Sequence, residues 1–138
     1  MRYFVDTNVL FDLYEEERPS HKDSFELVKL GLLGRVELIV TAASVMTMIY
    51  SLQRYKLPRD LIIGRLNMIL PHIEIAQINA AELLAGINSD WTDLEDAIQF
   101  HAAIANGPLD AIVSNDKDFK QQKLVPVITP KQAVKRLK

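Results

Sequence analysis

Short β-branched runs alternate along the chain with longer segments in which apolar residues recur at helical spacing. Each run is too short for a typical helix and is typical of a strand. The predicted strands cover residues 2–5, 36–40, 73–78, 111–113 and 125–128. Strands separated by helices need crossover connections, so the pattern predicts an α/β fold with a parallel sheet and helices on both faces.

Three segments show the helical spacing most clearly. Apolar residues recur every three or four positions in residues 25–32, 61–70 and 94–104. Pro58 and Asp60 suit a helix start before the second of these segments. The longest of the intervening loops carry Pro and Gly but are too short for a linker, so we expect one domain over residues 1–138.

The composition is that of an ordinary globular domain. The 138 residues are 49% hydrophobic and 25% charged, which argues against disorder and against a coiled coil. The formal net charge is −2. A protein that grips nucleic acid mainly by bulk positive charge would be basic, so that class is disfavoured. A small acidic site whose charge is reversed by a bound cation stays possible.

Cysteine usage and hydropathy limit the cellular compartment and the kinds of site that the chain can have. The chain has no cysteine, which excludes a disulfide framework, Cys-ligated zinc, an iron–sulfur cluster and a thiol nucleophile. Residues 1–6 show no basic-then-apolar signal pattern. The longest uncharged stretch, which begins at Leu38, is shorter than the ~20 residues that cross a bilayer. We therefore expect a cytoplasmic protein with no membrane partner.

Acidic residues follow two of the predicted strands directly. Asp6 comes after the first strand, and Asp116 comes three residues after the fourth. Parallel α/β sheets place their sites outside the carboxyl ends of the strands. If these two strands are neighbours, the two carboxylates converge at one edge of the sheet.

A third source of carboxylates opens the helix predicted over residues 94–104. Asp93 and Asp96 are three residues apart and share one helix face. Thr92 and Glu95 fit a capping box, and Asp93 suits the first turn of a helix, so these positions also have a structural explanation. Asp96 is followed mostly by apolar residues, and a carboxylate near a buried surface needs a partner or a metal.

Carboxylates gathered at one edge imply a divalent cation. Like charges repel, so the pKa values should rise unless a cation neutralises the group. Oxygen ligands, with no Cys and few His, select Mg²⁺ or Mn²⁺ rather than zinc. The sequence therefore predicts a Mg²⁺ or Mn²⁺ site formed by Asp6, Asp96 and Asp116.

Three segments together resemble the PIN-domain family. They are residues 5–10 (VDTNVL), 95–99 (EDAIQ) and 112–119 (IVSNDKDF). They are most similar to the small single-domain bacterial and archaeal proteins that include VapC-type toxins. The resemblance implies a three-layer α/β/α sandwich with a small parallel sheet, and a metal-dependent ribonuclease acting on RNA. It also implies a homodimer and, for a toxin, a cognate antitoxin that blocks the site.

The resemblance also assigns roles to the acids. It makes Asp6 the first, Asp96 the third and Asp116 the fourth acid of the site. Neighbouring residues could support them by orienting carboxylates or water, or by stabilising the site from behind. These supporting residues are Thr7, Asn8, Asp93, Ser114 and Asp118.

One departure from the family pattern concerns the second acid. The family usually carries Glu or Asp in the helix after the second strand, whereas residues 44–52 contain no acid, and Met48 or Thr47 occupies the position. Asp93 could partly substitute. Two readings stay open: an endoribonuclease with three carboxylates, or a degraded PIN domain that binds RNA or protein without cutting.

Two other acidic α/β folds fit less well. A haloacid-dehalogenase-type phosphatase needs a second Asp where Asn8 stands. A receiver domain needs an Asp at the end of the third strand, where residues 78–80 read Ile-Asn-Ala.

Overall fold

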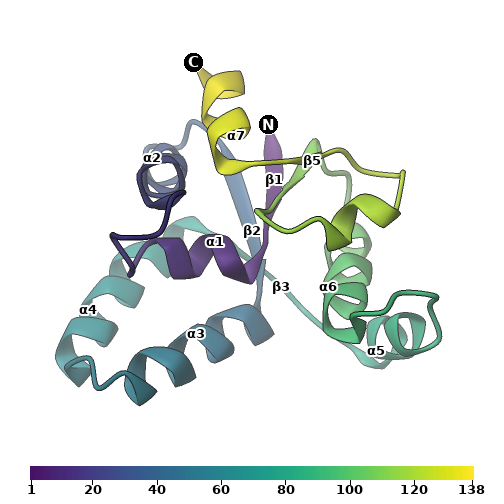
Figure 1. Ribbon diagram of the computed structural model, residues 1–138, viewed down its shortest axis with the longest axis horizontal. Helices are drawn as coiled ribbons and strands as arrows, with labels where there is room; N and C mark the ends of the chain where they lie inside the picture. Colours follow the sequence, from purple (N-terminus) through teal and green to yellow (C-terminus); the bar gives the residue numbers. More distant parts are fainter.

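A five-stranded parallel sheet forms the centre of the computed structural model, which describes residues 1–138 (Figure 1). The strand order is β3-β2-β1-β4-β5, and all four pairings are parallel. The strands are β1 (Arg2–Val5), β2 (Glu37–Thr41), β3 (Glu74–Ala76), β4 (Ala111–Val113) and β5 (Val127–Ile128). The predicted parallel sheet is confirmed, with β3 and β5 shorter than expected.

Helices fill the connections between the strands. The α-helices are α1 (Thr7–Asp12), α2 (His21–Leu32), α3 (Ala42–Arg54), α4 (Arg59–Ile69), α5 (Ala80–Ile87), α6 (Leu94–Ala105) and α7 (Pro130–Leu137). Two 3₁₀ turns are η1 (Leu70–His72) and η2 (Asp118–Gln121). Helices α2, α4 and α6 confirm the three predicted helical segments. Helices α1 and α5 were not predicted, because six and eight residues carry too few turns to show a period. No helix is long and apolar enough to cross a membrane.

Alternating side chains of β1 divide the core into two layers. Tyr3 and Val5 belong to the larger cluster, which includes side chains from α1, α2, α3, α4 and α7. Phe4 points to the other face and joins the smaller cluster with Phe100 of α6 and Phe119 of η2. Helix α5 packs against α6 on the right of Figure 1. The sheet therefore has helices on both faces, which confirms the α/β/α sandwich.

The strand register brings three chain segments to one edge of the sheet. Phe4 pairs with Ile39 on one side and with Ile112 on the other. Directly beyond β1, the backbone N–H of Asp6 donates to the carbonyl of Val113 at 3.0 Å. The carboxyl ends of β1, β2 and β4 are therefore neighbours, as the site prediction requires.

Helices α5 and α6 pack closely against each other. Gly86 of α5 faces Ile98 of α6, and a Cβ at Gly86 would lie 2.8 Å from the Ile98 backbone nitrogen. Such a distance is shorter than real Cβ contacts allow. Glycine is required there because the two backbones approach so closely.

Candidate active site

The first turn of α6 presents two aspartates to the site edge. Asp93 is the N-cap, and its Oδ1 accepts a hydrogen bond from the backbone N–H of Asp96 at 3.0 Å. The expected capping box between Thr92 and Glu95 is wrong. An Asp is as good an N-cap as Thr, so the helix begins one residue later than that pattern indicated.

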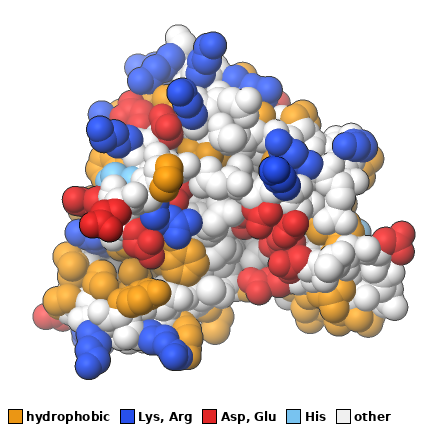
Figure 2. Space-filling view, in the orientation of Figure 1, with side chains coloured by type: hydrophobic (Ala, Val, Ile, Leu, Met, Phe, Trp, Pro, Cys, Tyr) orange, Lys and Arg blue, Asp and Glu red, His pale blue; other side chains and the backbone are white.

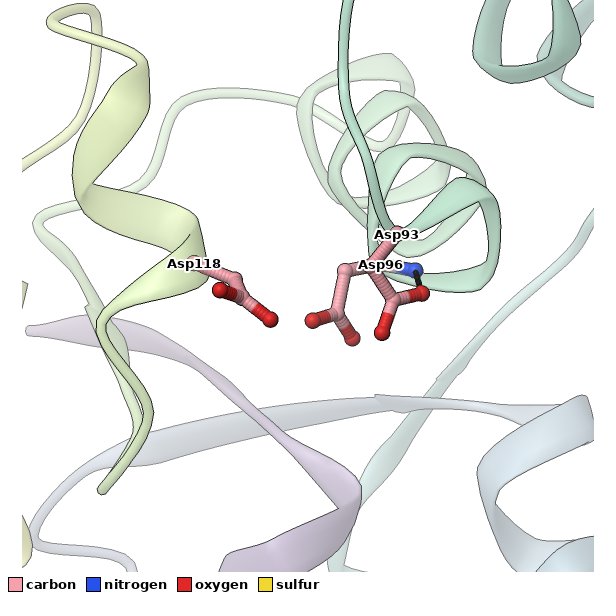
Figure 3. A group of neighbouring side chains, drawn as sticks. All are labelled: Asp93, Asp96 and Asp118. Atoms are coloured by element: carbon pink, nitrogen blue, oxygen red, sulfur yellow. Dashed lines mark hydrogen bonds between the residues drawn. The ribbon is translucent and has the colours of Figure 1, made fainter.

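Asp93, Asp96 and Asp118 form a compact carboxylate cluster. Figure 3 shows the Asp118 side chain, from η2, pointing toward Asp96 in the first turn of α6 and Asp93 just before that helix. One oxygen from each of the three carboxylates lies within 4.8 Å of the others. Asp93 is exposed, and the other two side chains are half-buried. The sequence placed Asp118 in a supporting position, and the structure brings it directly to Asp96.

Asp6 lies beside this cluster, and its carboxylate accepts hydrogen bonds from one side-chain amide and one hydroxyl. It is 6% exposed. Its Oδ2 accepts hydrogen bonds from Asn8 Nδ2 at 2.6 Å and from Ser114 Oγ at 2.7 Å. Ser114 Oγ in turn accepts the backbone N–H of Asp116 at 2.9 Å. The Ser114 hydroxyl therefore ties the end of β1 to the loop that carries Asp116.

The acids influence one another electrostatically. Burial raises the pKa of Asp6 to about 6, against the hydrogen bond from Ser114, and the charge of Asp116 adds to the rise. Burial, together with the charges of Asp6, Asp93, Asp116 and Asp118, raises the pKa of Asp96 to about 7. The structure thus brings the predicted Asp6, Asp96 and Asp116 into one negatively charged region. Of these three, only Asp96 belongs to the compact cluster.

A buried polar network lies behind the acids and joins α1, α3 and α6. The hydroxyls of Thr7 and Ser44 are 2.6 Å apart. The Thr41 hydroxyl donates to Oε1 of Gln99 at 2.9 Å, and Nε2 of Gln99 donates to the Ser44 hydroxyl at 3.0 Å. Sequence reasoning missed Gln99. The available signal was a polar residue three positions after Asp96 inside an apolar helix stripe.

Helix α3 supplies no carboxylate to the site. The expected position of the missing acid, Met48, is 4% exposed and belongs to the larger core. An acid at position 48 would therefore lie among apolar side chains. Thr47, the alternative position, is exposed. The residue aligned with the family's second acid was ambiguous by one position, and a shift of one residue turns a helix side chain by about 100°.

The fold and this acidic edge define a class of protein. The family model of the PIN domain matches residues 2–118, and the chain belongs to the PIN-domain family. More narrowly, it is a VapC-like PIN domain. It is 28% identical over 123 residues to Ribonuclease VapC1 of Aquifex aeolicus (strain VF5), covering 86% of this chain and 83% of that protein.

Two solved structures share the fold. One is a toxin–antitoxin complex from Klebsiella pneumoniae, with a TM-score of 0.65 at 18% identity, covering 93% of this chain and 97% of that one. The other is VapBC2 from Rickettsia felis, bound to a DNA fragment from their promoter. It has a TM-score of 0.65 at 19% identity and covers 94% of this chain and 98% of that one.

Proposed function

We propose that this protein is a metal-dependent endoribonuclease that hydrolyses RNA phosphodiesters. The observation that carries the proposal is the gathering of carboxylates at the carboxyl ends of β1 and β4 and at the start of α6. Similarity to a ribonuclease of the VapC type supports the same activity. Asp6, Asp96 and Asp116 are the proposed catalytic and metal-binding residues, with Asp93 and Asp118 beside them.

The donor set fits a hard divalent cation. Every ionisable side chain in the cluster offers carboxylate oxygen, which suits Mg²⁺ or Mn²⁺. Burial first, and the negative charge of neighbouring acids second, raise the pKa values of Asp6 and Asp96, and a bound cation would offset both effects. When bound, such a cation would polarise the phosphodiester and lower the pKa of a nearby water molecule.

The chain's own residues would orient the acids. Asn8 and Ser114 both donate to Oδ2 of Asp6, which fixes the plane of that carboxylate. The Asp93 cap fixes the first turn of α6 and hence the base of the Asp96 side chain. Thr7 is held by Ser44 behind the acids. Preorganised carboxylates need no rearrangement when charge develops on the phosphate.

The biological setting follows from the same similarity. We propose that the protein is the cytoplasmic toxin of a type II toxin–antitoxin pair, that it forms a homodimer, and that an antitoxin protein binds it. The fold shared with two solved toxin–antitoxin assemblies supports a protein partner.

The activity is tested by metal removal and by substitution of the acids. Cleavage of single-stranded RNA should stop in EDTA and return with Mg²⁺ or Mn²⁺. Asp6→Asn and Asp116→Asn should each be inactive, whereas Asp90→Asn, the same change on the exposed α5–α6 loop, should cleave like the parent. Equal cleavage by the parent and both site variants would rule out the assignment.

One observation favours a second candidate function. Because α3 carries no acid, the site has fewer carboxylates than the family pattern, and a non-catalytic RNA- or protein-binding module remains a defined alternative. A metal titration separates the two. A ligand that binds only the folded state raises the melting temperature, so an absent shift at millimolar Mn²⁺ would favour the binding module.

A further inference from the structure

A second buried carboxylate, unused by the proposed metal site, lies at the end of α1. Asp12 is 1% exposed. Its Oδ1 accepts Nε–H of Arg18 at 2.6 Å, and its Oδ2 accepts Ser24 Oγ at 2.6 Å and Asn115 Nδ2 at 3.0 Å. Asn115 stands directly before Asp116. The Asp12 carboxylate therefore bonds both to Arg18 and to the loop that carries Asp116, and it fixes their positions relative to each other.

Only one of the three Arg18 nitrogens is firmly engaged. Nε is used by Asp12, whereas Nη2 reaches the Asn8 carbonyl at 3.4 Å and Nη1 lies 3.5 Å from the exposed Glu15 carboxylate. Contacts of this length are at the weak end for N–H donors. The side chain is 34% exposed. A guanidinium carries five N–H donors, so its outer edge keeps capacity for another acceptor.

Arg18 lines an open pocket together with two acids of the site, Asp116 and Asp118. The pocket has a volume of about 470 Å³ and no hydrophobic side chain in its lining. Its lining residues are Asn8, Arg18, Asn115, Asp116, Lys117 and Asp118. Figure 2 shows acidic side chains near the middle of this face with Lys and Arg side chains close to them. The pocket therefore combines carboxylates for a cation with two cationic side chains for an anion.

We propose that Arg18, oriented by Asp12, binds a backbone phosphate of the RNA next to the phosphodiester that is cut. The inference rests on the proposed ribonuclease function and names how that site holds its substrate. A chain of net charge −2 has no bulk attraction for RNA, so a few placed cations must supply the phosphate contacts. A guanidinium already fixed by Asp12 loses little freedom on binding and matches phosphate geometry.

The experiment measures RNA binding rather than cleavage. Binding of a short labelled single-stranded RNA is followed by fluorescence anisotropy with Mg²⁺, in an Asp96→Asn background that blocks cleavage. Arg18→Gln should weaken binding about tenfold, as loss of a charge-assisted hydrogen bond does. The slope of log K against log salt should become shallower by about 0.7, the value for one phosphate contact on a single strand.

The controls separate phosphate binding from a structural role. Arg59→Gln makes the same change at a side chain that is 78% exposed on α4, and it should alter neither affinity nor slope. Arg18→Gln leaves the buried Asp12 charge unpaired, so the double variant Asp12→Asn/Arg18→Gln is compared with Asp12→Asn alone. The double variant should show the same loss of slope. An unchanged slope and affinity in the double variant would overturn the proposal.

Failure of this inference is distinguishable from failure of the ribonuclease proposal. If the parent cleaves RNA in a metal-dependent way and Arg18→Gln does not change RNA binding, the ribonuclease proposal is supported and the phosphate contact of Arg18 is rejected. If the parent does not cleave RNA but the salt dependence of binding changes in Arg18→Gln, the phosphate contact is supported and the protein is better described as a binding module.

Discussion

Replacing Asp96 by asparagine should stabilise the metal-free protein at and above neutral pH. Burial and four neighbouring acids raise the pKa of this carboxyl from its ordinary 3.8 to about 7. In the structure, the residue's bond to Asp93 is made by its backbone N–H rather than by its carboxylate. Asparagine has nearly the same shape and no charge, so it removes the repulsion and leaves that bond in place.

The sign and size of the effect follow from the raised pKa. Between about pH 4 and pH 7 the folded protein binds more protons at Asp96 than the unfolded chain does, so stability falls as the pH rises through this range. At 1.36 kcal/mol per pKa unit the ceiling is ~4 kcal/mol. Asp96 is only half-buried and solvent screens it, so we expect ~1–2 kcal/mol. In a domain of this size that corresponds to roughly 3–8 °C in melting temperature.

Thermal unfolding in EDTA at about pH 5 and about pH 8 checks the prediction. The variant should melt above the parent at the higher pH and close to it at the lower pH, and the exposed control Asp90→Asn should show no such difference. Millimolar Mg²⁺ or Mn²⁺ should then raise the melting temperature of the parent more than that of the variant. A parent as stable as Asp96→Asn at the higher pH would refute the picture of crowded carboxylates.

Three further predictions concern packing and the core, each read from chemical denaturation. Met48→Glu should lower the free energy of unfolding by ~3 kcal/mol or more, without a gain in cleavage rate, because the new carboxylate is buried among apolar side chains. Thr47→Glu, at an exposed position, should fold normally. Gly86→Ala should lower the free energy of unfolding by ~1–3 kcal/mol, because the new Cβ clashes with the backbone of α6. Gly64→Ala, with open space around it in α4, should raise the free energy of unfolding by ~0.5–1 kcal/mol. Asp12→Ala should lower the free energy of unfolding by ~1–3 kcal/mol, because it leaves the buried Ser24 hydroxyl and the Asn115 amide without their acceptor. Equal stability within either matched pair would contradict the packing described for those positions.

The sequence alone determined the strands, three of the helices and the motif segments. The β-branched runs predicted all five strands, and the helical spacing predicted α2, α4 and α6, because these signals depend only on neighbours along the chain. Asp6 was assigned to the carboxyl end of β1 for the same reason. The three motif segments were sufficient to indicate the PIN-domain family, which the family model confirms.

Only the tertiary structure decided which polar side chains meet. The strand order β3-β2-β1-β4-β5 places the ends of β1 and β4 together, and the packing of α6 against α5 and the sheet leaves Asp96 close to Asp118. The same packing buries Met48 and joins Asp12 to Asn115 across more than a hundred residues of chain. Proximity between distant segments depends on crossovers and helix rotation, and a local pattern of residues carries no record of either.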